Sequence, residues 1–403
     1  MPEAGEPGNK FGKMRTVPMK EHAGRNKSNS LWLRLSSAVV AIGSAFLIAI
    51  LATGIVRSEE KPLPQKNEQT ARGPLSAVGL ELVRTLKQQT PLERGYDVVF
   101  SPDGQLLASA WQQVERQASL RNFLGNGTIR LWNVTTGELV RTLQQEVDRK
   151  NDELASVAFS PDGRLVAASS SVIGPSSIYV WELRTGTLLK RFPVKDSVRQ
   201  LTFTPDGAMI ASACDDGLVY VWDTATGKLV RTLKHPGIVV SVAFNPRDGK
   251  ILAAGDYRQS VRIWDISNGN QIRILQSNPP SYGEAVAFSP DGQLLATGHA
   301  SGQLRVWNSR TWQAVWSAEN PKSEIGSVAF SPSGELLAAT LGRSALRIWD
   351  PAKGGLLGSF DISDGSEPTR FAGTSVAFHP NLPLLATSLS GDYLKIWKIN
   401  IQR

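Results

Sequence analysis

Short apolar runs alternate with turn-forming residues along most of the chain. In residues 197–233, apolar runs at 201–203, 209–213 and 218–222 precede a mixed run at 228–233. The segments between them are rich in Pro, Asp and Gly, which preset or permit the backbone angles of tight turns. The last apolar run is rich in β-branched and aromatic residues, which favour a strand. The pattern predicts four consecutive antiparallel strands.

A tryptophan ends the third run of each such unit. The series comprises Trp132, Trp181, Trp222, Trp264, Trp307, Trp349 and Trp397. Successive members are separated by 49, 41, 42, 43, 42 and 48 residues. A fixed period of this size with four strands per period is the sequence signature of a propeller. We therefore predict an all-β fold, a seven-bladed β-propeller of four-stranded antiparallel blades over residues 78–403, with the tryptophans as structural residues.

Two recurring motifs resemble those of the WD-repeat family. The turn Ser-Pro-Asp-Gly occurs at residues 101–104, 160–163 and 289–292, and looser versions occur in other units. The dipeptide Trp-Asp occurs at 222–223, 264–265 and 349–350. The resemblance covers roughly residues 78–399. It implies a propeller that acts as a protein–protein interaction scaffold, without enzymatic activity or a cofactor.

The closure of the ring can also be predicted. The last unit stops shortly after Trp397 and lacks an outer strand, whereas residues 80–86 repeat the outer-strand sequence of residues 228–233. We expect the N-terminal segment to supply the outer strand of the seventh blade. Closure protects sheet edges that would otherwise promote aggregation.

The WD-repeat family often connects its strands through a His, a Ser or Thr, an Asp and the Trp. Only His235 stands where the family's His would, and only Asp216 stands where its Asp would. These two residues belong to different blades, so we expect no blade to have the full tetrad. The tryptophans then serve as structural markers, and apolar packing is expected to carry the stability.

The formal net charge of +8 is concentrated at the N-terminus. Residues 1–34 contain seven Lys and Arg against three Asp and Glu, whereas residues 75–403 contain 33 against 30. A nucleic-acid-binding domain is expected to carry its basic excess itself. The nearly neutral propeller therefore argues against a nucleic-acid partner.

The first 77 residues are expected to form an appendage. Residues 1–34 form a basic tail, and residues 35–56 are 22 consecutive uncharged residues, enough for a helix to cross a hydrocarbon core of about 30 Å. A signal peptide has a shorter apolar core of about 7–15 residues, and a propeller offers no core for a buried helix. We expect a transmembrane helix at 35–56 and a flexible linker at 57–77, rich in Pro and polar residues.

The lysines and arginines of the tail favour a cytoplasmic N-terminus, with the propeller on the periplasmic, extracellular or lumenal side. A cytoplasmic propeller is the alternative, because the charges nearest the two ends of the span are almost balanced. Small residues also recur every fourth position in the span, which permits self-association or simply reflects the abundance of alanine in membrane helices. They are Ser37, Ala41, Ala45, Ala49 and Thr53.

The repeat is interrupted by long segments at 111–127, 144–155, 170–176 and 361–373. All fall on blades seven, one and two, which become neighbours when the ring closes. Long loops on a rigid scaffold often bind partners, although neutral insertions are also tolerated. Aromatic and arginine side chains dominate binding energy. The candidate partner-binding residues are therefore Tyr96, Trp111, Arg116, Arg121, Phe123, Arg370 and Phe371.

No catalytic or metal-binding pattern accompanies these repeats. The four histidines have no partner His or Cys at metal-ligand spacing, and the aspartates of the Ser-Pro-Asp-Gly turns belong to different blades. The one cysteine, Cys214, excludes an intrachain disulfide. The principal hypothesis is a membrane-anchored interaction scaffold that uses the long loops. The alternative is a ligand-binding or enzymatic propeller with a small-molecule site on the same face or in the central channel.

Overall fold

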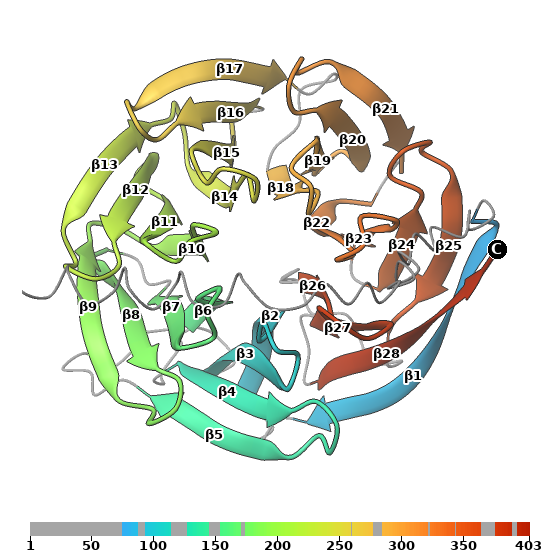
Figure 1. Ribbon diagram of the computed structural model, residues 1–403, viewed down its shortest axis with the longest axis horizontal. Helices are drawn as coiled ribbons and strands as arrows, with labels where there is room; N and C mark the ends of the chain where they lie inside the picture. The colour runs from blue at the N-terminus through green and yellow to red at the C-terminus, as the bar shows by residue number, and fades with distance from the viewer. Residues whose placement is uncertain are drawn as a thin grey trace, which may run out of the picture. The chain divides into compact units, whose positions relative to one another are not determined.

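The computed structural model describes residues 75–87, 93–113, 127–144, 154–170, 174–258, 260–276, 284–320, 323–342, 344–363, 375–388 and 393–403. These residues form 28 β-strands in seven four-stranded antiparallel sheets around a central axis (Figure 1). The predicted tail, membrane span and nearly all of the linker lie outside the described residues. In the described part of the chain, we find no helix with the length and hydropathy needed to cross a bilayer.

We number the blades in chain order, and the strands of each blade follow one another from the central axis to the rim (Figure 1). Blade one contains β2 (Glu93–Phe100), β3 (Leu106–Gln113), β4 (Thr128–Asn133) and β5 (Leu139–Gln144). Blade two contains β6 (Leu154–Phe159), β7 (Leu165–Ser170), β8 (Ser176–Glu182) and β9 (Leu188–Val194). Blade three contains β10 (Val198–Phe203), β11 (Met209–Cys214), β12 (Leu218–Asp223) and β13 (Leu229–Lys234).

The remaining blades repeat this order. Blade four contains β14 (Val239–Phe244), β15 (Ile251–Asp256), β16 (Ser260–Asp265) and β17 (Asn270–Gln276). Blade five contains β18 (Glu284–Phe288), β19 (Leu294–His299), β20 (Gln303–Asn308) and β21 (Ala314–Glu319). Blade six contains β22 (Ile325–Phe330), β23 (Leu337–Leu341), β24 (Ala345–Trp349) and β25 (Leu356–Asp361). Blade seven contains β26 (Ser375–Phe378), β27 (Leu384–Ser388) and β28 (Tyr393–Gln402), with β1 (Ala77–Lys87) as its outer strand.

The hydrophobic core consists of seven apolar clusters, one between each pair of neighbouring blades. Each tryptophan of the repeat belongs to the cluster between its own blade and the preceding one, and none is more than 8% exposed. Trp222, for example, stacks on Phe192 of blade two at a centroid distance of 5.5 Å. The predicted structural role of the seven tryptophans follows from this packing, because burial of an aromatic side chain removes a large apolar area from water.

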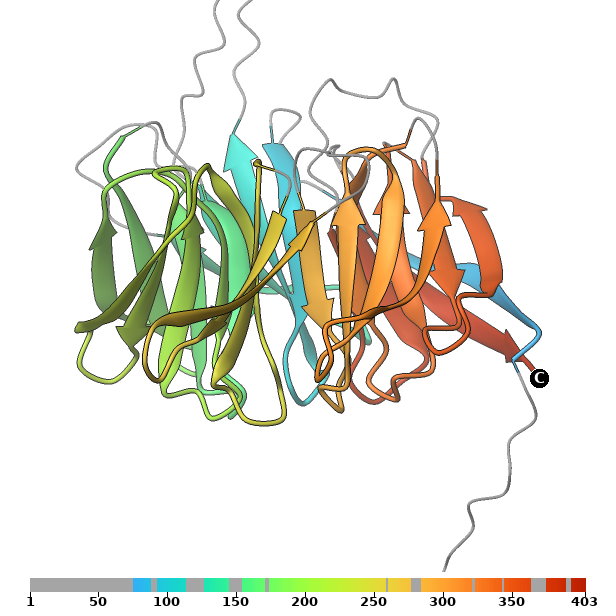
Figure 2. The same ribbon diagram turned by 90° about the horizontal axis from the view of Figure 1, so that it is seen from above.

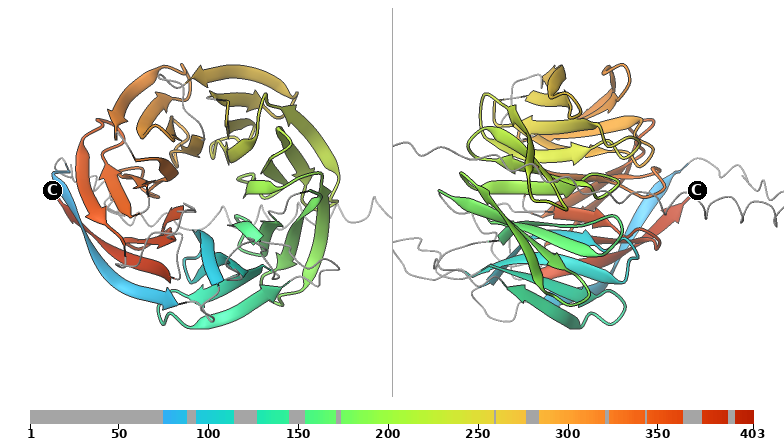
Figure 3. Two further views of the ribbon diagram at one scale, coloured as in Figure 1. Left: turned by 180° about the vertical axis from the view of Figure 1, so that it is seen from behind. Right: turned by 60° about the vertical axis from the view of Figure 1, so that its left-hand side comes forward.

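The predicted closure by the N-terminal strand is confirmed. β1 pairs antiparallel with β28, with Leu80 opposite Ile399 and Leu86 opposite Leu394 (Figure 3). Leu86 packs into the apolar cluster between blades seven and one, and Val78 packs into the cluster between blades six and seven. The strand thus covers two junctions as well as completing its own sheet.

Arginines on the outer strands connect neighbouring blades at the rim. From β1, Arg84 donates hydrogen bonds to the backbone oxygens of Thr136 and Thr135 in blade one, at 2.6 and 2.5 Å. From β5, Arg141 donates in the same way to the backbone oxygen of Leu183 in blade two, at 3.3 Å. The N-terminal strand is therefore held to the first blade by the same contact that joins two ordinary blades.

Candidate partner-binding face

The two faces of the propeller differ in the connections they carry (Figure 2). In blade one, Trp111 lies opposite Thr128, and Thr128 lies opposite Gln144. The register therefore places the link from the second to the third strand, and the link to the next blade, on one face. We call it the loop face, and we call the opposite face, which carries the Ser-Pro-Asp-Gly turns, the turn face. The predicted long segments all begin or end on the loop face.

Most of the predicted binding residues lie outside the described residues. They are Arg116, Arg121, Phe123, Arg370 and Phe371, and their part in binding stays a prediction. Tyr96 is described and partly exposed, at the loop-face end of β2.

The structure removes Trp111 from the accessible surface of the loop face, contrary to our expectation. Its side chain is 1% exposed, and its indole N–H donates to the Ser109 hydroxyl at 2.6 Å. The ring lies 6.4 Å from that of Trp132, and the Arg130 guanidinium lies 4.7 Å from its centroid. Opposite it on β2 is Gly95, where a Cβ would lie 3.0 Å from a Leu394 methyl and 3.7 Å from the indole. Trp111 therefore anchors the base of the long segment, and a partner cannot reach it in this structure.

A β-bulge recurs at the loop-face end of the first strand in five blades. The register shifts between Gly95 and Asp97 in blade one and between Val198 and Gln200 in blade three, and it shifts at the same position in blades two, four and six. A bulge leaves one residue unpaired and redirects its side chain. The bulged residues are Tyr96, Ala155, Arg199, Val240 and Gly326.

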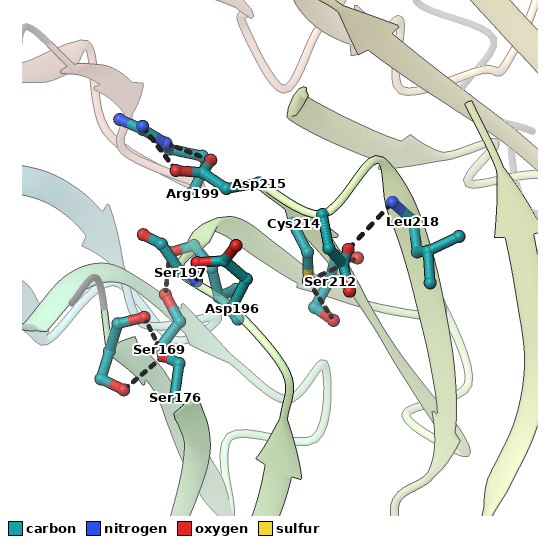
Figure 4. A network of polar contacts seen from close by, with 12 residues as sticks. Ser169, Ser176, Asp196, Ser197, Arg199, Ser212, Cys214, Asp215 and Leu218 are labelled. Carbon is teal, nitrogen blue, oxygen red and sulfur yellow. Dashed lines mark hydrogen bonds and ion pairs between the residues drawn. The ribbon is translucent and has the colours of Figure 1, made fainter. Parts of the chain in front are cut away.

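Arg199 is a residue of this face that our sequence analysis missed. Its Nε and Nη2 donate to the two carboxylate oxygens of Asp215 at 2.6 and 2.7 Å, as Figure 4 shows. The hydrogen bonds that the guanidinium donates to this carboxylate raise the pKa of Arg199 above its already high value. The side chain is 41% exposed. Arg199 precedes Phe203 by four residues, as Tyr96 precedes Phe100. This shared spacing is the sequence signal that could have identified Arg199.

One carboxylate joins the three blades that carry the long segments. Asp97 of blade one accepts hydrogen bonds from the Ser156 hydroxyl and the Val157 N–H of blade two, both at 3.0 Å. It also accepts from the Ser375 hydroxyl of blade seven at 2.8 Å and from the Val98 N–H at 2.9 Å. Burial raises the pKa of this carboxyl, and the four donors oppose that effect by stabilising the anion.

Asp97 belongs to a belt of hydrogen bonds around the channel. In four other blades, the residue three positions before the Phe of the first strand accepts a hydrogen bond through its side chain. The donor is a backbone N–H on the first strand of the next blade. Ala285 holds this position in blade five and has no side-chain acceptor. Within the belt, Asp97 contacts both neighbouring blades through its side chain. The other bonds are Leu201 N–H to Ser156 at 3.3 Å, Val242 N–H to Gln200 at 2.9 Å, Val286 N–H to Ser241 at 3.1 Å and Val376 N–H to Ser327 at 3.4 Å.

Comparison with known proteins agrees with this architecture. A family model described as "IFT122 first beta-propeller" matches residues 153–403, well over half of the chain, and one described as "WD domain, G-beta repeat" matches residues 81–133. The chain belongs to the WD-repeat β-propeller family.

Curated relatives resemble only part of this WD-repeat chain. WD repeat-containing protein SL1-17 of Schistosoma mansoni is 29% identical over 201 residues, which are 50% of this chain and 64% of the relative. The COMPASS component SWD3 of Saccharomyces cerevisiae is 24% identical over 155 residues, 38% of this chain and 48% of the relative. Transcription initiation factor TFIID subunit 5 of Caenorhabditis elegans is 29% identical over 154 residues, 38% of this chain and 23% of the relative. The chain therefore spans less than two thirds of the length of these relatives.

Blade four contains a buried hydrogen-bonded network of a His, an Asp, a Ser and the repeat Trp that our sequence analysis did not find, although Ala254 holds the second-strand position where three other blades have a hydroxyl. The Trp264 N–H donates to His235 Nε2 at 3.1 Å, so the His235 proton is on Nδ1, which lies 3.0 Å from an Asp256 oxygen. The Ser260 hydroxyl donates to the same oxygen at 3.2 Å. We had looked for an aspartate six residues before the tryptophan. Asp256 precedes Trp264 by eight because it ends β15 instead of lying in the following turn.

Three further WD-repeat blades hold the tryptophan through a different hydrogen bond. Their indole N–H groups donate to a buried hydroxyl on the second strand: Trp132 to Ser109 at 2.9 Å, Trp307 to Thr297 at 3.0 Å and Trp397 to Thr387 at 2.9 Å. These bonds satisfy the indole donors within the apolar clusters, since an unpaired buried donor is costly. The tryptophans are thus fixed by polar contacts as well as by packing.

The turn-face aspartates have the structural role that the sequence predicts. Asp103 accepts from the Ser101 hydroxyl at 2.5 Å and from the Gln105 N–H at 3.0 Å, and the hydrogen bond from Ser101 lowers the pKa of the Asp103 carboxyl. The same arrangement occurs at Asp162, Asp206 and Asp291. Among the described residues, no three His, Cys, Asp or Glu side chains gather in a way that could hold a metal ion.

Replacing Asp97 should destabilise the ring more than replacing any other belt residue. Asp97→Ala leaves the Val98 and Val157 N–H groups without their acceptor, and an unsatisfied buried donor costs about 1–3 kcal/mol. The measurement is the free energy of unfolding in denaturant. Ser241→Ala is the matched control, because it removes the acceptor of one N–H, that of Val286. Equal losses in the two variants would contradict the assigned role of Asp97.

Proposed function

We propose that this protein is a membrane-anchored WD-repeat scaffold that holds protein partners on the loop face of blades seven, one and two. Three relatives belong to assemblies by name: one is a COMPASS component, one a TFIID subunit and one a target of rapamycin complex subunit. The observation that carries the proposal for this chain is the position of Asp97. It joins the three blades that carry the long segments.

A rigid base matters because a loop binds best when its ends are fixed. Ordering a flexible segment on binding costs free energy, and a fixed scaffold reduces that cost. Asp97 lies on β2, and Trp111 packs near the end of β3, after which the segment 114–126 follows. Both residues belong to the blade from which that segment leaves. The long segments before β6 and β26 end at the strands whose Ser156 and Ser375 hydroxyls donate to the same carboxylate.

The anchor at residues 35–56 completes the proposal. β1 begins at Ala77, opposite Gln402, at the turn-face end of blade seven. The described part of the chain thus begins on the face opposite the proposed partner site. The positive charges of the tail favour a cytoplasmic N-terminus with the propeller on the other side of the membrane.

Replacing residues 114–126 with a short Gly-containing turn should weaken partner binding at least about tenfold, since binding energy concentrates in a few central residues. The replacement must spare Trp111, whose burial makes its loss a stability defect. Binding is measured with the partner that chemical crosslinking identifies in native membranes. Tyr257→Ala is the control, because Tyr257 is 38% exposed in blade four, away from the proposed site. Equal affinity for the wild type and the replacement would exclude this segment as the binding element.

The anchor predicts that the full-length chain stays with membranes after alkaline extraction, whereas a chain beginning at residue 57 is released. Protease added to intact cells should degrade the propeller if it lies outside the cytoplasm. Protection from protease until the membrane is permeabilised supports the opposite orientation. Release of the full-length chain by alkaline buffer would exclude the anchor itself and leave the loop-face proposal untouched.

A further inference from the structure

The junction between blades seven and one contains an ionisable group on the turn face. His379 is 3% exposed, and its Nδ1 accepts the N–H groups of Asn381 at 3.0 Å and Leu382 at 2.9 Å. Because Nδ1 faces two donors, the ring proton is on Nε2. This N–H donates to the backbone oxygen of Gly104 in blade one at 2.9 Å. The imidazole is therefore neutral, and both of its nitrogens are used.

The corresponding position in the other six blades cannot change its charge. Its occupants are Ser101, Ser160, Thr204, Asn245, Ser289 and Ser331. Asn245 makes the same contacts as His379: its Oδ1 accepts the Arg247 N–H at 2.9 Å, and its Nδ2 donates to the backbone oxygen of Gly292 in blade five at 3.0 Å. An asparagine and a histidine thus connect two junctions in the same way, and only the histidine can take up a proton.

The surroundings of His379 prevent the ring from adjusting when it is protonated. The Phe100 ring packs edge-on at a centroid distance of 5.0 Å, and Gly104 lies so close that a Cβ there would clash with the imidazole. A proton on Nδ1 would face the two N–H donors at hydrogen-bond distance. Escape from that contact requires the turn that follows His379 to move relative to blade one.

We infer that His379 is a pH-sensitive clasp, and that acidification loosens the closure of the ring between blades seven and one. The charged group that acts on the imidazole is Asp103 of blade one, which favours protonation. Burial has the larger effect and lowers the pKa of His379 below its usual value of about 6.5. An open junction takes up the proton more readily than the closed one. The clasp is therefore intact near neutral pH, and its contribution is lost as the pH falls from about 6.5 toward the lower pKa of the closed state.

Loosening at this junction affects the blades to which we assign partner binding, although the inference itself does not depend on that function. Blade seven is also the blade completed by β1, so its closure relies on pairing between distant parts of the chain. The contacts of Asp97 and Arg84 hold the same junction at the channel and at the rim. Acid should therefore open it locally before the other blades unfold.

The test is hydrogen–deuterium exchange of the full-length chain at pH 7.5 and 5.5, with exchange times scaled for the pH dependence of amide chemistry. In the wild type we expect peptides of β1 and β26–β28 to exchange up to about tenfold faster at the lower pH, because an imidazole of ordinary pKa, about 6.5, is about ten times more protonated than neutral at pH 5.5 when the junction is open. His379→Asn copies the contacts of Asn245 without an ionisable group and should abolish this acid response. His235 is present in both proteins, so its titration does not distinguish them.

The reciprocal substitution, Asn245→His, should create an acid response in peptides of blades four and five. It keeps the inference testable if His379→Asn fails to fold. An equal acid response in the wild type and His379→Asn would overturn the inference. So would an Asn245→His protein that folds, retains the His379 response and gains none at blades four and five.

Discussion

Closure of the ring is the constraint on which every other feature depends. Each sheet buries its faces against its two neighbours, and the apolar clusters lie between blades instead of within them. A ring open at one junction would expose two of these faces to water. In this protein the last junction is closed from the far end of the sequence, because β1 supplies the outer strand of blade seven.

Several contacts reinforce that junction at different distances from the axis. Asp97 connects blades seven, one and two beside the channel, and Arg84 bonds blade one at the rim. On the turn face, His379 connects blade seven to Gly104 of blade one. The long segments that we associate with partners leave from these same blades. The proposed binding site therefore stands on blades that are connected beside the axis, at the rim and on the turn face.

The fold was predictable because its signals are periodic. The seven tryptophans, the Pro-Asp-Gly turns and the repeated outer-strand sequence all recur with the same period. A unit in which one motif is irregular can therefore still be assigned from the others. The individual contacts were less predictable. Trp111 looked like a loop residue, but it packs inward against Trp132 and its indole N–H bonds the Ser109 hydroxyl. Asp256 escaped notice because it lies at a strand end, two residues outside the searched position. Arg199 is placed by a β-bulge, and only its spacing before Phe203, which repeats that of Tyr96 before Phe100, could have identified it from the sequence.

The central claim is that residues 80–86 close the ring by pairing with β28, and a cysteine pair tests it most directly. Glu81 and Lys398 are exposed partners directly opposite each other, and the native Cys214 is buried. Directly opposite residues bring their Cβ atoms within about 4.5–5.5 Å, close to disulfide geometry. We predict that Glu81→Cys with Lys398→Cys forms an intramolecular disulfide on mild oxidation and raises the melting temperature. A pair that stays reduced, or that links only separate chains, would contradict the closure.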